Sequence, residues 1–267
     1  MLKQRVITAI VLVALVLVSL FIKNPIYWRA LISAAVIIGF WEWLRFCKIE
    51  APIEKVLSYC LFGWCFYTLQ ANYLSLSVIV PVLCGLWSLL LCFTLSSKLD
   101  FLHNRAIKLL IGVVVLSAGG LILIELKTLP AGAYWVLCFM ASVWAADVGA
   151  YFVGRRFGKT KLAPTVSPGK TVEGLLGGVA FMLVVYVPTL FYYFSFKTAC
   201  LLLVTVLITT LVSVGGDLFE SKMKRFSGLK DSSQILPGHG GVLDRIDSLL
   251  SGAPFFALGL IALGYLN

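Results

Sequence analysis

The sequence predicts an all-α, polytopic integral membrane protein with about nine transmembrane helices. Of its 267 residues, 60% are hydrophobic and only 13% are charged, and the mean hydropathy is +0.99. Soluble domains are about half apolar and about a quarter charged. The ionic side chains are therefore too few to cover a globule of this size, and most of the apolar surface must face lipid.

Nine apolar stretches account for the expected helices. A membrane-spanning helix needs about 20 mainly apolar residues, and stretches near this length lie at 6–22, 26–41, 56–69, 73–95, 106–126, 131–153, 175–196, 198–216 and 249–266. Lys23, Asn24 and Pro25 follow the first stretch in place of a small-residue cleavage site. This stretch is therefore expected to be a retained helix and not a signal peptide.

The basic residues predict the topology. If the N-terminus is cytoplasmic, 18 of the 22 Lys and Arg residues, Lys98 among them, lie on the cytoplasmic side. The four that lie outside are Lys23, Arg29, Lys127 and Lys197. Because cytoplasmic loops are enriched in Lys and Arg, the N-terminus is expected inside and the C-terminus outside. Topology then explains the net charge of +10, and no nucleic-acid partner is expected.

Polar residues divide the chain into two parts. Seven of the 12 acidic residues lie between positions 147 and 247, namely Asp147, Glu173, Asp217, Glu220, Asp231, Asp244 and Asp247. Residues 1–130 are expected to be transmembrane scaffold, and 131–267 a catalytic region with cytoplasmic loops at 154–174 and 217–248. The seven cysteines are scattered and form no CxxC pair, so they are expected to be small buried hydrophobes.

Asp147 lies inside an apolar stretch. A carboxylate there costs about 3 kcal/mol on insertion scales and normally faces a polar cavity or partner. A functional role is favoured, and pairing with a structural arginine or backbone donor is the alternative.

The segment 217–231 is expected to extend a transmembrane helix into the cytosol. Helical spacing puts Asp217, Ser221 and Lys224 on one face, with Glu220 pointing off it. A carboxylate at membrane level, with Lys224 and Arg225 further out, suits a metal-bound polyphosphate. A basic juxtamembrane helix that attracts anionic lipid is an equal alternative.

The run ILPGHGGVLDRIDS (235–248) combines a glycine loop with two carboxylates. Gly240 and Gly241 allow backbone N–H groups to approach a ligand closely, or they form a tight turn. Asp244 and Asp247 are one helical turn apart, a credible Mg²⁺ site. His239 is more simply explained as a hydrogen-bonded loop residue than as a general base.

The segment 154–174 contains GKT at 169–171, but it is not a P-loop. Pro164 stands where that motif needs glycine, and no strand is expected before it. Lys170 and its neighbouring lysines suit phosphate binding, and Glu173 could supply a metal ligand or orient a lysine. A solvated loop that obeys the positive-inside rule is the alternative.

These segments together resemble the CDP-diacylglycerol synthase (phosphatidate cytidylyltransferase) family. The matching polar positions are Ser221, Lys224, Arg225, Lys230, Asp231, Pro237, His239, Gly240, Gly241, Asp244, Arg245 and Asp247. The stretch from Asp147 to VSPGKTVEG resembles the family's upstream motif. The resemblance covers residues 147–248, whereas the N-terminal half matches only in hydropathy.

The resemblance implies that CTP and phosphatidic acid react, with Mg²⁺, to give CDP-diacylglycerol and pyrophosphate. It assigns Asp217, Asp244 and Asp247 to the metal. It assigns phosphate or substrate binding to Lys224, Arg225, Arg245, Lys170, Lys230, Ser221, His239, Gly240 and Gly241, and leaves Asp147, Glu173 and Asp231 as further candidates. A second cation, which could be monovalent, and a homodimer stay open. The implied location is a bacterial inner membrane, with the active site facing the cytoplasm.

Three other classes of protein compete with this interpretation. A transporter or channel for an anionic substrate also places acids in the membrane, but it often has repeated halves, which this chain lacks. The CDP-alcohol phosphatidyltransferases carry a DG-x₂-AR motif that is absent here. A non-catalytic scaffold leaves the acidic cluster unexplained.

Overall fold

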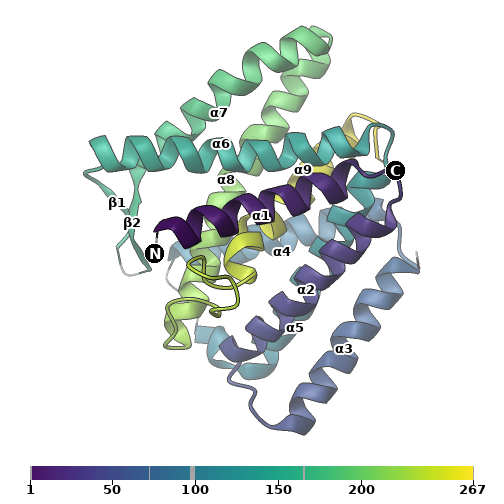
Figure 1. Ribbon diagram of the computed structural model, residues 1–267, viewed down its shortest axis with the longest axis vertical. Coiled ribbons are helices and arrows are strands. Elements are labelled where there is room, and N and C mark those ends of the chain that lie inside the picture. The colour runs from purple at the N-terminus through teal and green to yellow at the C-terminus, as the bar shows by residue number, and fades with distance from the viewer. Residues whose placement is uncertain (1, 72, 97–99, 165, 267) are drawn as a thin grey trace.

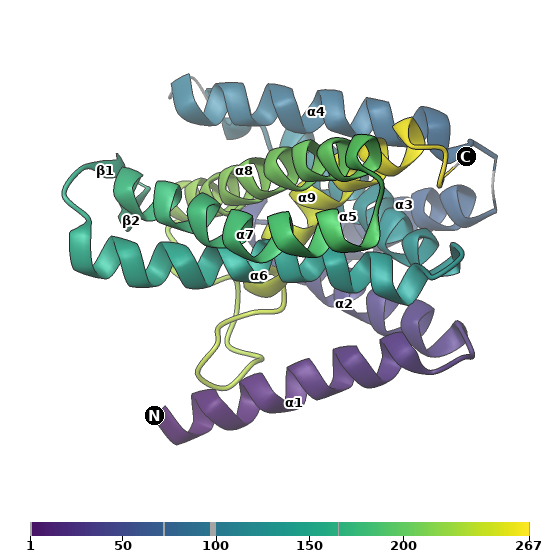
Figure 2. The same cartoon turned by 90° about the horizontal axis from the view of Figure 1, so that it is seen from above.

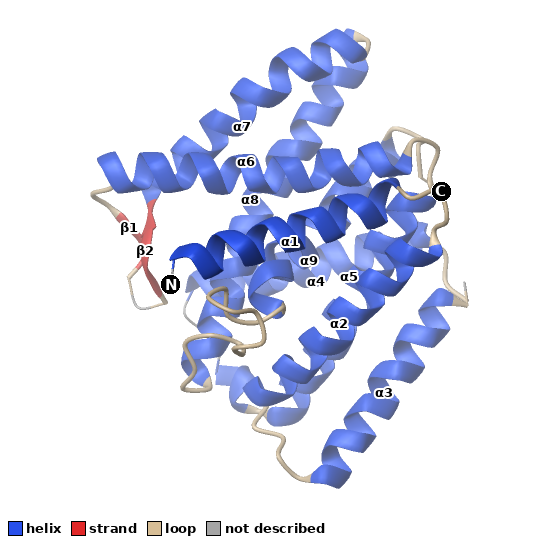
Figure 3. Ribbon diagram, viewed as in Figure 1, coloured by secondary structure: helices blue, strands red, loops and turns tan. Residues whose placement is uncertain are grey.

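The computed structural model describes residues 2–71, 73–96, 100–164 and 166–266, so Lys98 and Asn267 lie outside the described residues. The described part is mainly helical (Figures 1 and 3). Its elements are α1 (Leu2–Phe21), α2 (Ile26–Phe46), α3 (Pro52–Gln70), α4 (Leu76–Ser96), a 3₁₀ turn (Asp100–His103), α5 (Arg105–Thr128), α6 (Gly132–Phe157), β1 (Lys161–Ala163), β2 (Ser167–Thr171), α7 (Val172–Tyr193), α8 (Phe196–Phe226) and α9 (Leu243–Ala262).

Seven of the described helices, α1 and α4 to α9, are long and apolar enough to cross a membrane. Helices α2 and α3 correspond to two further predicted stretches but are more polar, since α2 contains Arg29 and Glu42 and α3 contains Glu54 and Lys55. Large apolar side chains are exposed on the outer faces, as with Val184 at 71%. These features confirm an all-α polytopic membrane protein.

The segment between α6 and α7 corrects two expectations. It is largely ordered, because α6 continues to Phe157 and a short antiparallel hairpin follows, with Lys161 opposite Thr171. The residues GKT therefore lie in strand β2, although no strand was expected. The P-loop is still excluded, because Lys170 is part of the strand and Thr171 directly caps α7 by accepting from the Gly174 N–H at 3.1 Å.

The packing of α8 against α9 positions the polar residues. A Cβ atom at Gly216 would lie 2.0 Å from the Ser251 hydroxyl oxygen of α9. Only glycine therefore permits this close approach, as is common between transmembrane helices. The approach brings Asp217, the next residue of α8, towards the first turns of α9.

The polar segments gather at one end of the molecule. Figures 1 and 2 place the start of α1, the β1–β2 hairpin and the α8–α9 loop at this end, and the end of α9 at the other. The α8–α9 loop contacts α1 directly, because the Thr8 hydroxyl donates to the Pro237 carbonyl at 3.1 Å. Segments that are far apart in sequence therefore surround a single region.

Candidate active site

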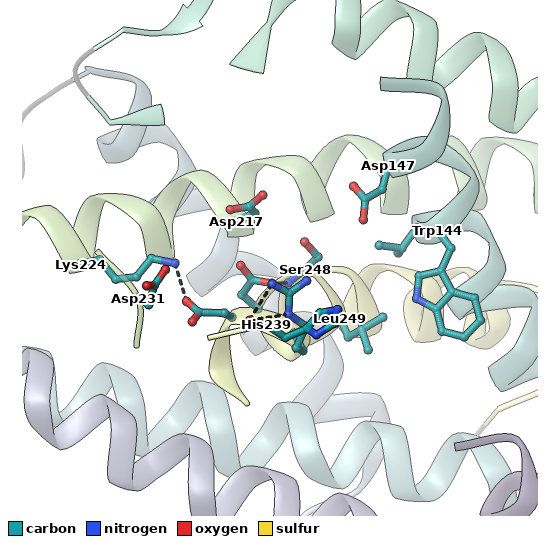
Figure 4. Close-up of a pocket in the computed structure, with 12 residues that line it drawn as sticks. Trp144, Asp147, Asp217, Lys224, Asp231, His239, Ser248 and Leu249 are labelled. Carbon is teal, nitrogen blue, oxygen red and sulfur yellow. Dashed lines mark hydrogen bonds and ion pairs between the residues drawn. The ribbon is translucent and has the colours of Figure 1, made fainter. Parts of the chain in front are cut away.

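A polar cavity of about 400 Å³ lies where α6, α8, α9 and the α8–α9 loop meet (Figure 4). Most of the residues predicted from the sequence line it. They are Asp147 from α6, Asp217 and Lys224 from α8, Asp231 and His239 from the loop, and Asp244, Arg245 and Asp247 from α9.

Three carboxylates form a tight cluster beside this cavity. Asp217, Glu220 and Asp247 each offer an oxygen within 4.8 Å of the others. Glu220 is 2% exposed, and its Oε1 atom is buried without a hydrogen-bond partner among the described residues. Like charges this close disfavour joint ionisation unless a cation balances them. The three-carboxylate cluster therefore suits a divalent metal, and its oxygens are of the type that Mg²⁺ prefers.

The position of Glu220 corrects the expectation that it points off the face. Ser221 does lie beside Asp217, with its hydroxyl 3.3 Å from the Asp217 carboxylate. Glu220, however, is one turn from Asp217 and has a carboxylate oxygen within 4.8 Å of one from Asp247 of α9, because α9 packs against this side of α8. Spacing along one helix does not reveal where a second helix will lie.

Asp244 is held in a different way from the three clustered acids. Its carboxylate accepts from Lys224 Nζ at 2.6 Å, from the Gly241 N–H at 2.8 Å and from the Ser232 N–H at 3.1 Å. Lys224 also contacts Glu220 at 3.1 Å. The lysine thus bridges Asp244 and the three-carboxylate cluster, and it is itself buried.

The hairpin delivers a second lysine to the site. Lys170 Nζ lies 2.6 Å from the Asp217 carboxylate. Glu173 does not join the acids, because it accepts from the backbone N–H groups of Lys159 and Thr160 at 3.1 Å and so fixes the start of the hairpin.

The glycine loop shapes the wall of the cavity. Gly240 has φ +83°, a left-handed conformation that favours glycine, and a Cβ atom there would lie 2.6 Å from the Asp244 carboxylate. The His239 carbonyl accepts from Arg245 Nε at 3.2 Å and Nη2 at 2.9 Å, which holds the exposed guanidinium at the cavity. His239 Nδ1 is buried, with no partner in the part of the chain that is described.

Two predicted cations lie apart from this arrangement. Arg225 and Lys230 are exposed and are not among the residues that line the cavity. Arg225 donates instead to the Leu229 carbonyl at 3.3 Å.

An apolar cavity of about 530 Å³ adjoins the polar one between α1, α2, α6 and α9. Side chains such as Leu12 and Val36 line it. Both cavities share Trp144, His239, Arg245 and Leu249 as lining residues. The charged site therefore meets an apolar space at Arg245 and His239.

Sequence reasoning missed Glu42 in α2. Its side chain is fully buried and accepts hydrogen bonds from the α8–α9 loop. Glu42 directly follows the predicted stretch 26–41, so the rule that drew attention to Asp147, an acid inside an apolar stretch, did not select it.

Comparison with known proteins shows the family to which the chain belongs. The sequence model of the Cytidylyltransferase family matches residues 3–263. The chain belongs to this family. Proteins named phosphatidate cytidylyltransferase are similar along nearly their whole length: the Haemophilus influenzae protein is 40% identical over 96% of this chain and 98% of its own. The Pseudomonas aeruginosa protein is 39% identical over 99% of both chains, and the Bacillus subtilis protein is 34% identical over 97% and 98%.

These matches confirm the resemblance drawn from residues 147–248 and extend it over the N-terminal half. They give no support to the transporter or channel alternative.

Proposed function

We propose that this chain is an enzyme that transfers a cytidylyl group from CTP to phosphatidate, giving CDP-diacylglycerol and pyrophosphate. Family membership and the names of the relatives supply the reaction class. The observation that carries the proposal is a cavity that combines carboxylates with a lysine and an arginine and adjoins an apolar space. CTP and a phospholipid need these two environments side by side.

The three-carboxylate cluster is the proposed Mg²⁺ site. Asp217, Glu220 and Asp247 provide hard anionic oxygens, and the buried Glu220 Oε1, which has no hydrogen-bond partner among the described residues, suits a metal ligand. When bound, Mg²⁺ would neutralise charge on the CTP phosphates as pyrophosphate leaves. Asp244, the third acid in the set that the family resemblance assigns to the metal, is proposed to orient Lys224 and the glycine loop.

The chain's own cations bring two anions together. A phosphatidate phosphate oxygen forms the new bond to the α-phosphorus of CTP, and the bond from that phosphorus to the pyrophosphate oxygen breaks. The phosphate is already a nucleophile, so no strong base is required. Lys224 and Arg245 would hold and orient phosphates by charge-assisted hydrogen bonds. Lys170, now 2.6 Å from Asp217, would turn to a phosphate once a cation shares that carboxylate.

The apolar cavity is the proposed path for the acyl chains. It runs between α1 and the bundle and ends at Arg245 and His239. A phospholipid with its chains there would present its phosphate to the guanidinium, at the border of the polar cavity.

We propose that all nine helices cross a bacterial inner membrane and that the site faces the cytoplasm. The gathering of the start of α1, the hairpin and the α8–α9 loop at one end supports a cytoplasmic N-terminus. Residues 131–267 would supply the reacting groups, and residues 1–130 would hold them in place.

The test is a reconstitution assay. Purified protein is mixed with phosphatidic acid, radiolabelled CTP and Mg²⁺, with EDTA as the control. The expected result is labelled CDP-diacylglycerol with an equal amount of pyrophosphate, and neither in EDTA. Absence of lipid-dependent pyrophosphate release from folded protein would refute the proposal.

A further inference from the structure

Glu42, near the end of α2, is 0% exposed and contacts a segment about 200 residues later in the chain. Its Oε1 accepts from the Ser233 hydroxyl at 2.5 Å and from the Val242 N–H at 3.0 Å. Its Oε2 accepts from the Ser232 hydroxyl at 3.1 Å and from the Leu243 N–H at 2.6 Å. Burial of a carboxylate is costly unless donors surround it, and here each oxygen accepts two hydrogen bonds.

Two of these donors belong to the start of α9. The N-cap residue of α9 is Val242, whose side chain makes no capping hydrogen bond. The first N–H groups of a helix lack partners within the helix and carry partial positive charge, which favours an anion. Glu42 supplies that anion from another helix. It therefore fixes the start of the helix that carries Asp244 and Asp247.

Glu42 and Asp244 hold the same short stretch of loop from two sides. The Ser232 hydroxyl lies 3.1 Å from Glu42 and 3.0 Å from Asp244. It has one proton and donates to one of them at a time. A Cβ atom at Gly241 would lie 1.9 Å from the Ser232 hydroxyl oxygen and 2.2 Å from Glu42 Oε1. Glycine at this position is therefore what lets Glu42 reach the loop.

The end of α2 is fixed independently of this loop. The Trp43 indole donates to the Lys108 carbonyl of α5 at 2.8 Å, and Lys108 Nζ donates to the Phe46 carbonyl at 2.9 Å. The Ser227 hydroxyl, directly after α8, donates to the same carbonyl at 2.9 Å. Glu42 thus lies on a helix end that has contacts of its own with α5 and Ser227, and Arg45 of the same helix end also donates to the Ser232 carbonyl.

We propose that Glu42 is a positioning residue for the cytidylyl transfer, an inference that rests on the proposed function. By anchoring residues 232–243 and the first turn of α9, it keeps Asp247 in the three-carboxylate cluster and Asp244 on Lys224. The N-terminal half of the chain then contributes a specific polar contact to the site as well as scaffold helices.

Glu42→Gln tests this role with nearly unchanged side-chain shape. The amide replaces one acceptor oxygen by a donor that faces an N–H group, so that contact becomes a clash of two donors, whereas the serine hydroxyl beside it can reverse and accept. The negative charge at the start of α9 is lost as well. Because charge-assisted hydrogen bonds are strong, kcat is expected to fall about 10- to 100-fold. The half-saturating Mg²⁺ concentration should rise, whereas KM for CTP should change little. Glu42→Asp, which keeps the charge on a shorter side chain, should recover part of kcat.

Hydrogen exchange gives a readout that needs no turnover. Amides of 232–243 should exchange faster in Glu42→Gln, with the rest of the chain unchanged. Glu54→Gln, at an exposed acid of α3, is the matched control and should behave like the parent. Parental kcat, Mg²⁺ dependence and exchange in Glu42→Gln would overturn the inference.

If Glu42→Gln does not fold, a second variant tests the same role. The substitution Ser233→Ala removes one hydroxyl donor of Glu42 and leaves the Asp244 contacts and the two N–H contacts in place. It should shift the same measurements in the same direction by less, and parental values would again overturn the inference. If the parent itself releases no pyrophosphate, the proposed function fails, while the exchange comparison still decides whether Glu42 anchors the loop.

Discussion

Glu220→Gln distinguishes between two candidate sets of Mg²⁺ ligands. Both contain Asp217 and Asp247, and the third acid is Glu220 in the cluster seen in the structure but Asp244 in the set that the family resemblance assigns. Three oxygens of Asp217, Glu220 and Asp247 lie within 4.8 Å of one another. At that separation, with an effective dielectric constant of about 20, two unit charges interact by about 3.5 kcal/mol. A cation inside the cluster is at least as close to Glu220. Since about 1.4 kcal/mol corresponds to a tenfold change, the half-saturating Mg²⁺ concentration should rise about 300-fold.

The assay measures Mg²⁺ in two ways. Initial rates of pyrophosphate release are recorded against Mg²⁺ at saturating CTP and phosphatidic acid. Thermal unfolding in detergent is recorded over the same Mg²⁺ range, so that binding is seen without turnover. Glu220→Gln should shift both curves, and Glu54→Gln should shift neither. The Mg²⁺-free Glu220→Gln protein should unfold at about the parental temperature, because Lys224 retains Asp244 at 2.6 Å and joint ionisation of the three acids is already disfavoured without a cation.

Asp244→Asn is the decisive comparison. It removes the charge that holds Lys224 and weakens the acceptor for Gly241 and Ser232. Turnover and thermal stability should fall, yet the Mg²⁺ concentration at half-saturation should stay close to the parental value. If Asp244→Asn shifts the Mg²⁺ curves and Glu220→Gln does not, the reasoning from the three-carboxylate cluster is wrong and Asp244 is the third ligand.

Three further outcomes are expected. Lys224→Ala should lower kcat/KM about 10- to 100-fold through lost charge-assisted contacts, and Arg225→Ala less, because Arg225 is exposed outside the cavity lining; equal losses would contradict this order. Lys170→Ala should weaken CTP-dependent turnover and strengthen Mg²⁺ binding, because Asp217 loses a competing cation at 2.6 Å; weaker Mg²⁺ binding would contradict it. Single cysteines placed in the hairpin and the α8–α9 loop of a cysteine-free chain should be labelled from the cytoplasm, and one at the exposed Tyr265 from outside; labelling of the loop and residue 265 from the same side would show that α9 does not cross the membrane.

The helices and most of the cavity could be predicted because they depend on local composition. An apolar stretch of membrane length forms a helix wherever it lies, and the extension of α8 to Phe226 follows the spacing of Asp217, Ser221 and Lys224. The acids of the second half are also scarce enough to stand out. Local composition does not reveal how one helix is rotated against another, so contacts between helices could not be predicted from it.

Glu220 and Glu42 were misjudged or missed for that reason. Glu220 joins the cluster because α9 approaches α8 at Gly216 and Ser251, a contact between residues 35 positions apart. Glu42 depends on contacts with residues up to 201 positions away. Its neighbours Trp41 and Trp43 make the stretch read as the apolar end of a helix, and only the folded chain shows that α9 lacks a cap of its own.

The position of the site follows from the opposite solubilities of its two proposed substrates. Five acids and a lysine line the polar cavity. At the centre of the bilayer they would carry a large desolvation cost, so the proposed site is at the cytoplasmic border of the membrane. The acyl chains of a phospholipid cannot leave the bilayer for the same kind of reason. The two substrates can therefore meet only where the polar cavity adjoins the apolar one. Arg245 lines both cavities, and its guanidinium donates to the His239 carbonyl. An arginine suits this place because it stays charged beside apolar groups and binds phosphate in a fixed geometry. Arg245→Lys would keep the charge but lose the paired donors to the His239 carbonyl, so turnover with phosphatidic acid is expected to fall although the charge at this boundary is unchanged.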